Sequence, residues 1–177
     1  MNRRKLEAEA IRDSVLFVSG KLNLTPYGPG FQDFVVEKPE HSPHYQYHLF
    51  DPENPVSHRR SIYRFIVRSQ QQPFMTTLDC ADPSLRVDRR NESLSALQAL
   101  TLLNNGFMVT MSKHFAEQIA AAKKDDLPGQ LSLAVLRTLG RTPTSEELTD
   151  LTNYTQKHGL ANTCRLLLNL NEFSFVD

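Results

Sequence analysis

The sequence predicts a mainly α protein, a single helical domain of five or six helices that spans residues 1–177 around one core. Three observations favour this fold class. Apolar residues recur at helical spacing in residues 3–19 and again from residue 93 onward. Between these regions, residues 23–57 hold six of the ten prolines, which predicts a long proline-rich loop. The pattern also leaves room for a small β-sheet of two or three strands.

Composition and charge narrow the class of protein. The chain has 177 residues, of which 40% are hydrophobic, and 20 basic residues balance 20 acidic ones. A chain of this length buries roughly 70% of its unfolded surface. Zero net charge argues against a general binder of nucleic acid or of anionic membranes, because both need a basic excess. The sequence holds no apolar run of 18 residues, so we expect no membrane-spanning helix.

Residues 3–19 predict an amphipathic helix that ends before Gly20, a residue suited to a left-handed cap. Its apolar positions include Leu6, Ala10, Ile11, Val15 and Val18. The charged residues expected largely on the opposite side are Glu7, Glu9, Arg12 and Asp13. Because the chain begins directly with this charged helix, it predicts no signal peptide. We expect it to be the C-terminal piece of a larger protein.

The loop 23–57 is too rich in aromatic residues to be a solvated linker. We expect its rings to pin it onto the helical body, and loops of this length often carry function. Its aromatic residues are Tyr27, Phe31, Phe34, Tyr45, Tyr47 and Phe50. Within it, residues 34–37 predict a short strand.

Residues 61–67 fit two structures. Alternation would place Tyr63, Phe65 and Val67 on one face of a strand, whereas a helix would align Arg60 with Arg64. The residue types favour the strand, and residues 173–176 are its predicted partner.

Capping signals define the helices of the second half. Ser95 and Gln98 form a capping-box pattern, Asn105 can cap a helix that runs to about residue 123, and Thr144 begins a second capping box. A helix over 128–139 should end at Gly140. A last helix is expected over 160–171.

Residues 58–105 carry the strongest resemblance to a known family. They read His-Arg-Arg-Ser-Ile-Tyr-Arg-Phe-Ile-Val-Arg from residue 58, Pro-Phe-Met-Thr-Thr-Leu-Asp-Cys-Ala-Asp-Pro from residue 73, and Leu-Ser-Ala-Leu-Gln-Ala-Leu-Thr-Leu-Leu-Asn-Asn from residue 94. This stretch resembles the planctomycete PSD-one domain family, as do residues 4–13 and 166–173. That family typically forms the C-terminal part of large proteins with cytochrome-c-like modules, and its role is unassigned. The resemblance implies an exported or periplasmic parent protein and upstream domains as partners.

Arginine and aspartate residues give the candidate ligand site. An arginine fork holds a carboxylate with two hydrogen bonds, so Arg60 and Arg64 are expected to share a polar network with Asp79 and Asp82. The alternative is a pocket for an anionic ligand such as an acidic polysaccharide. In that case Tyr45 and Tyr47 would stack on sugar rings beside the arginines. The candidate ligand-binding residues are therefore Tyr45, Tyr47, Arg60, Arg64, Asp79 and Asp82.

Other sites are not supported. His41, His44 and His48 have spacing that could serve a transition metal, but their segment predicts no shared face, so loop histidines are the simpler interpretation. No motif for a catalytic nucleophile, a phosphate loop, a zinc helix or c-type haem attachment is found. We therefore expect neither cofactor nor metal, and a non-catalytic binding or scaffolding module. The alternative is a subdomain that completes the active site of a polysaccharide-processing or redox enzyme together with upstream domains.

Overall fold

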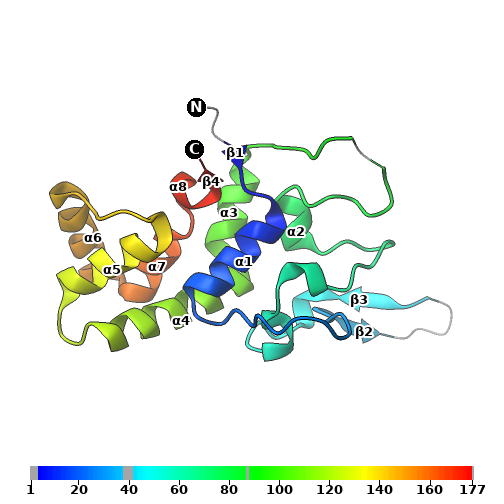
Figure 1. Ribbon diagram of the computed structural model, residues 1–177, viewed down its shortest axis with the longest axis horizontal. Coiled ribbons are helices and arrows are strands. Elements are labelled where there is room, and N and C mark those ends of the chain that lie inside the picture. Colours follow the sequence, from blue (N-terminus) through cyan, green and yellow to red (C-terminus); the bar gives the residue numbers. More distant parts are fainter. Residues whose placement is uncertain (1–3, 38–41, 87, 177) are drawn as a thin grey trace.

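The fold is mainly helical, as the sequence predicts, and Figure 1 shows its layout in a computed structural model. The structure describes residues 4–37, 42–86 and 88–176. Within them the helices are α1 (Ala8–Val18), α2 (Pro73–Thr77), α3 (Ala96–Asn104), α4 (Gly106–Ala122), α5 (Leu127–Leu139), α6 (Ser145–His158), α7 (Leu160–Leu167) and α8 (Asn171–Ser174). The short helices α2 and α8 are additional to the five or six that the sequence predicts. None of the described helices is long and apolar enough to cross a bilayer.

The long helix α4 organises the core. It packs most extensively against α7 and also contacts α1, α3 and α5. Met108, Met111, Phe115 and Ile119 line its inner face and are completely buried. Figure 1 shows α4 running beneath α1 and α3 toward the α5–α7 group, so one helix joins the two halves of the molecule.

The two ends of the chain meet in a small antiparallel sheet. β1 (Arg4–Lys5) pairs with β4 (Phe175–Val176), so Lys5 lies opposite Phe175. The first helix therefore begins at Ala8 rather than at residue 3. The prediction that residues 173–176 pair with residues 61–67 is wrong, because the edge of β4 is taken by β1.

Residues 61–67 do not form the predicted strand. Ser61–Tyr63 is instead a 3-10 helix, η3, whose first residue is fixed by α1: Asp13 Oδ1 accepts hydrogen bonds from the amide and the hydroxyl of Ser61, both at 2.7 Å. Beyond η3 the chain is extended only around Arg64, which forms an isolated bridge with Phe31. A polar contact from a distant helix thus overrides the local strand preference.

The proline-rich loop is held by aromatic packing, as predicted. It contains the hairpin of β2 (Val35–Glu37) and β3 (His44–Gln46), which confirms the expected strand, and two 3-10 turns, η1 (Tyr47–Leu49) and η2 (Pro55–His58). The buried ring of Phe34 meets Tyr45, Tyr47 and Phe65 edge-on, at centroid distances of 5.0, 5.4 and 6.2 Å. Such pairs add about 0.5–1.5 kcal/mol each beyond area burial.

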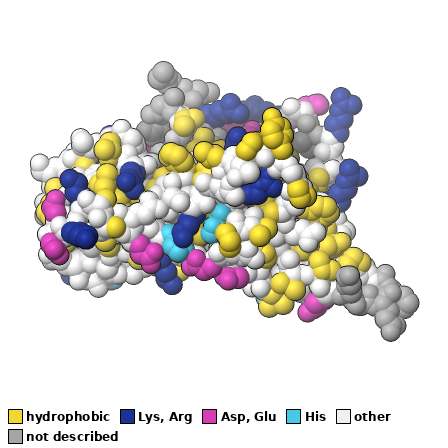
Figure 2. Space-filling view, turned by 60° about the horizontal axis from the view of Figure 1, so that its bottom comes forward, with side chains coloured by type: hydrophobic (Ala, Val, Ile, Leu, Met, Phe, Trp, Pro, Cys, Tyr) yellow, Lys and Arg dark blue, Asp and Glu magenta, His cyan; other side chains and the backbone are white. Residues whose placement is uncertain are grey.

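Polar contacts hold the two ends of the loop. Arg59 donates to the carbonyl of Pro29 at 2.7 Å and to that of Tyr27, and its guanidinium lies 4.1 Å from the ring centroid of Tyr63. Near the other end, His114 of α4 pairs with Glu53 at 2.6 Å. Figure 2 shows histidine and acidic side chains next to one another on this face, and hydrophobic side chains gathered over the half that carries the loop.

Candidate functional site

Asp79, one of the predicted site residues, is the centre of a structural polar cluster. Its carboxylate accepts hydrogen bonds from Lys5 Nζ at 2.8 Å, the Ser93 amide at 2.8 Å and Gln98 Nε2 at 3.0 Å. Burial acts to raise the pKa of Asp79, but these bonds outweigh burial and lower that pKa below its ordinary value. The cluster ties β1 to the segment that follows α2 and to α3.

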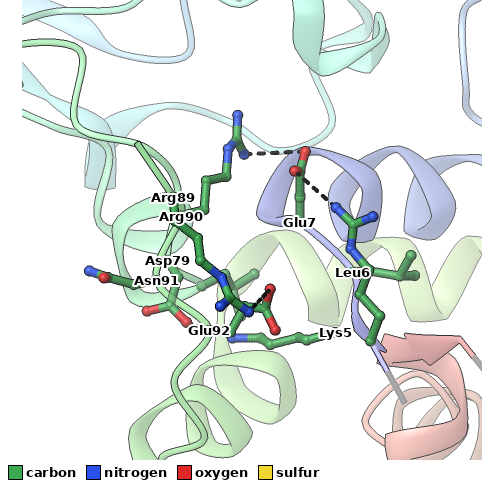
Figure 3. A pocket seen from close by; sticks show the side chains of 10 residues that line it. Lys5, Leu6, Glu7, Asp79, Arg89, Arg90, Asn91 and Glu92 are labelled. Carbon is green, nitrogen blue, oxygen red and sulfur yellow. Dashed lines mark hydrogen bonds and ion pairs between the residues drawn. The ribbon is translucent and has the colours of Figure 1, made fainter. Parts of the chain in front are cut away.

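The hollow beside this cluster is lined by charges that satisfy one another. It has a volume of about 470 Å³. Figure 3 shows Glu7 at its edge, where Arg4 and Arg90 approach to 3.8 and 3.4 Å. Arg90 also pairs with Glu9 at 2.7 Å. With its main cations already bound to acids, the hollow has little charge to offer a ligand, and we interpret it as structural.

The structure does not bring the four predicted arginine and aspartate residues into one network. Arg60 pairs with Asp13 of α1 at 3.5 Å, and Asp79 pairs with Lys5. Asp82 accepts the amide of Ser84 at 2.8 Å and so closes a local turn. Asp82 therefore stabilises a turn and does not take part in the predicted network.

The two predicted tyrosines anchor the hairpin. Tyr47 donates its hydroxyl proton to the carbonyl of Gln70 at 2.8 Å, and the amide of Tyr45 donates to the Gln70 side chain at 3.2 Å. Burial, followed by the charge of Asp33, raises the pKa of Tyr47 to about 12. Both rings pack on Phe34, so stability accounts for part of their role. Tyr47 in addition lines a second cavity.

This second cavity is a cleft between the proline-rich loop and the helical body. Its volume is about 430 Å³, within the range of small-molecule sites. The loop supplies Tyr47, Phe50 and Pro52, and the helices supply Phe74 of α2 and Phe107 of α4. The cleft also contains the charged side chains of Arg12 and Asp33. Because it combines aromatic walls with charged groups, we take it as the candidate functional site.

Arg12 forms the floor of the cleft, although its position predicts a solvent-facing side chain. It is only 5% exposed. Its guanidinium lies 5.2 Å from the ring of Phe31 and 5.5 Å from that of Phe107. It donates to the carbonyls of Ser57 and Arg59 and, at 3.2 Å, to the hydroxyl of Ser61. Burial lowers the pKa of Arg12 to about 10, so the group stays charged at neutral pH.

Asp33 is the other charged group of the cleft. It is 7% exposed, and its Oδ1 has no hydrogen-bond partner among the described residues. Burial raises the pKa of Asp33, whereas the charges of Arg64 and Arg12 act in the opposite direction. A buried carboxylate oxygen without a donor costs free energy, so its presence at a cavity wall calls for an explanation.

The sequence predicts neither of the charged groups of the cleft as a site residue. Arg12 lies on the polar side of an amphipathic pattern, and Asp33 lies in a loop without a motif. One signal could have found Arg12: an arginine next to the apolar residue Ile11 can reach loop carbonyls over the helix edge. Asp33 lies two residues after Phe31 and directly before Phe34, with no regular spacing or motif, so it offers no comparable signal.

Metal binding receives no support from the described residues, among which no three histidine, cysteine or acidic side chains are grouped to hold an ion. His44 and His48 are exposed, and His41 lies outside the described residues.

Comparisons with known proteins assign the family. No curated protein and no solved structure matches the chain. A family match covers residues 1–155, and the family's description reads "PSD1: Protein of unknown function (DUF1553)". This agrees with the resemblance seen in residues 58–105, although the match stops short of residues 166–173. Because the match covers most of the chain, the protein belongs to the PSD1 (DUF1553) family.

Proposed function

We propose that this chain is a non-catalytic binding module of a larger exported protein, and that its cleft holds part of a polysaccharide. The observation that carries the proposal is Asp33, a buried carboxylate that lines an aromatic cavity and whose Oδ1 has no hydrogen-bond partner in the part of the chain that the structure describes. A carboxylate that costs stability in the free protein is expected where a ligand supplies the missing donor.

The shape and lining of the cleft support a sugar ligand. A volume of about 430 Å³ accommodates one or two sugar rings, and the rings of Phe107, Phe50 and Tyr47 can face the C–H side of a pyranose. Arg64, whose charge acts on Asp33, and the exposed Arg60 belong to the same side of the molecule as the loop. In this proposal they lie near the rim, together with Tyr45, and contact the polysaccharide outside the cleft. Asp79 and Asp82 have structural roles.

The chain also presents an apolar stripe that suits a partner within a larger protein. Leu94, Leu97 and Leu100 precede or belong to α3 and are 74%, 62% and 55% exposed. We propose that upstream domains of the parent protein cover this stripe. A Leu97→Glu/Leu100→Glu variant should remain folded but lose association with the separately produced upstream part. If binding of that part is unchanged, the stripe is not the contact.

Polysaccharide binding is tested by affinity electrophoresis of the chain through gels that contain neutral or acidic polysaccharides. Gly106 lies in the cleft at the first position of α4, and a Cβ there would meet nothing nearer than Pro52 Cγ at 3.9 Å. A Gly106→Gln variant should therefore fold and partly fill the cleft. Ser145→Gln, at the exposed first position of α6, is the matched control.

We expect at least one polysaccharide to retard the wild type and the Ser145→Gln control, and to retard Gly106→Gln clearly less. If no polysaccharide retards the wild type, the proposed ligand class is wrong. Equal retardation of all three proteins would place the binding site outside the cleft.

A further inference from the structure

We propose that the group held in the cleft is an uncharged sugar ring, bound through hydroxyls that donate to Asp33. This inference rests on the proposed function and narrows it, because the arginine-rich sequence by itself favours an acidic polysaccharide. The choice of a neutral ligand follows from the contacts that each charged side chain of the cleft already makes.

Arg12 has little left to offer an anion. Of its five N–H groups, three donate to the carbonyls of Ser57 and Arg59 and to the hydroxyl of Ser61. Aromatic rings approach the guanidinium from Phe31 and Phe107. A ligand carboxylate held by both terminal nitrogens would have to replace bonds that fix η2 and η3 against α1. Arg12 is thus part of the cleft's framework.

Asp33 opposes an acidic ligand and lacks a donor. It lines the same cavity as Arg12, and its Oδ1 has no partner among the described residues. A ligand carboxylate or sulfate near it would face a like charge in a setting of low dielectric, where repulsion is strong. A hydroxyl or an N–H group, by contrast, would supply the hydrogen bond that the chain does not provide.

Donors also line the cleft. Gly106 is the first residue of α4; Asn105 accepts the next amide, that of Phe107, whereas the amide of Gly106 itself has no acceptor within the helix. Gln72 also lines the cleft, and its Oε1 accepts the amide of Met75 at 2.8 Å, which leaves the Nε2 end as a donor. A ligand that satisfies these groups must therefore both accept and donate hydrogen bonds.

Among common biological groups, hydroxyls meet both demands at once. An ammonium group only donates, and it would lie near the positive charges of Arg12 and Arg64, both of which act on Asp33. A carboxylate only accepts. A neutral pyranose has hydroxyls that can donate to Asp33 and accept from Gly106 and Gln72, and an apolar face for Phe107, which selects it over uronic acids and amino sugars.

The test compares matched polysaccharides that differ only in charge, together with a cationic probe and a set of neutral glycans. Polygalacturonate and alginate are each compared with their carboxyl-reduced forms, in which a neutral CH₂OH group replaces the carboxylate. Chitosan serves as the cationic probe, and laminarin, xylan, mannan and cello-oligosaccharides complete the neutral set. The proteins are the wild type, Asp33→Asn and Asp150→Asn, a matched control at an exposed position of α6. The folded state of each is checked by circular dichroism.

We expect the wild type to bind a neutral member and to bind any matched acidic form at least tenfold more weakly. Asp33→Asn should weaken neutral binding about tenfold, because a hydroxyl donates a stronger hydrogen bond to a carboxylate than to an amide. Asp150→Asn should leave neutral binding unchanged. Binding of acidic or cationic forms alone overturns this inference while keeping the proposed function. Neutral binding that Asp33→Asn leaves unchanged or strengthens overturns it too. Absence of binding to every polysaccharide overturns the proposed function itself.

Discussion

Replacing Asp79 by alanine should destabilise the protein more than most single substitutions. The carboxylate of Asp79 and the ammonium of Lys5 are 2.8 Å apart, and their side chains are only 15% and 8% exposed. Ser93 and Gln98 donate to the same carboxylate. Asp79→Ala removes all of these bonds and leaves the charge of Lys5 buried without its counter-ion.

The magnitude follows from two contributions. Breaking a buried ion pair by removing one partner costs about 3–5 kcal/mol. Asp79 also has φ of 67°, a left-handed conformation that aspartate tolerates better than alanine, which adds roughly 1 kcal/mol. The sum, about 4–6 kcal/mol, is a large part of the 5–15 kcal/mol typical of a domain. For a chain of this size it corresponds to a fall in Tm of roughly 8–24 °C.

The assay is urea unfolding at pH 7 in a double-mutant cycle with Lys5→Met. Because the two residues share one buried pair, the combined loss should be clearly smaller than the sum of the single losses. Arg64→Ala, by contrast, should add to Asp79→Ala, since the charge of Arg64 acts on Asp33 and not on Asp79. Asp82→Ala, which removes a local turn contact, serves as the control. A loss below about 1 kcal/mol for Asp79→Ala, or full additivity with Lys5→Met, would refute the buried pair.

The same pair predicts a pH dependence. The pKa of Asp79 is lowered in the folded protein from its ordinary value of 3.8, so the pair stabilises the fold above that value. This contribution is lost as the pH falls through the lowered folded-state pKa. The difference in stability between wild type and Asp79→Asn should therefore be constant near neutrality and shrink in acid. A difference that persists unchanged at pH 2 would contradict the lowered pKa.

Three further predictions concern other charged groups. Because burial raises the pKa of Asp33, its charge destabilises the folded protein as the pH rises through that pKa. Asp33→Asn should therefore raise Tm at pH 7 and not at pH 3, and a lower Tm at pH 7 would contradict this effect. Arg12→Met should lose about 3–5 kcal/mol in urea unfolding, because Asp13 and Asp33 lose their buried counter-ion, and a loss under 1 kcal/mol would count against that role. Arg141 binds Glu147 through two hydrogen bonds, of 2.7 and 2.9 Å, and holds the pKa of Glu147 at about 2. In Arg141→Ala, titration followed by NMR should show a raised pKa of Glu147, and an unchanged pKa would disprove the contact.

Local capping signals explain why the helices could be predicted. The hydroxyl of Thr144 accepts the Glu147 amide, and the Glu147 carboxylate accepts the Thr144 amide, which completes the predicted capping box. Asn105 caps α4 through the Phe107 amide, and Gly140 ends α5 with φ of 71°. Each of these contacts joins residues within one helical turn, so neighbouring residue types suffice to predict it.

The candidate site could be predicted only in part, because its contacts join distant segments. The sequence indicated the side where the loop 23–57 meets the arginine-bearing segment, and Tyr47 does line the cleft. It did not indicate that Arg12 turns inward to reach carbonyls about 45 residues away, or that Lys5 rather than Arg64 pairs with Asp79. The hydroxyl of Ser95 accepts the Gln98 amide as predicted, but the Gln98 side chain donates to Asp79 and does not complete the capping box. Long-range polar partners decided each of these cases.

The most direct test of the central claim, that the cleft is the binding site, is an NMR titration of the isotope-labelled chain with a neutral oligosaccharide that retards it in gels. The account predicts amide shifts concentrated at Gly106 and Phe107 in α4 and at Tyr47 and Asp33 in the loop. The region around Glu92, beside the charge-balanced hollow, should not respond. Shifts confined to that hollow, or to the exposed stripe of α3, would contradict the account.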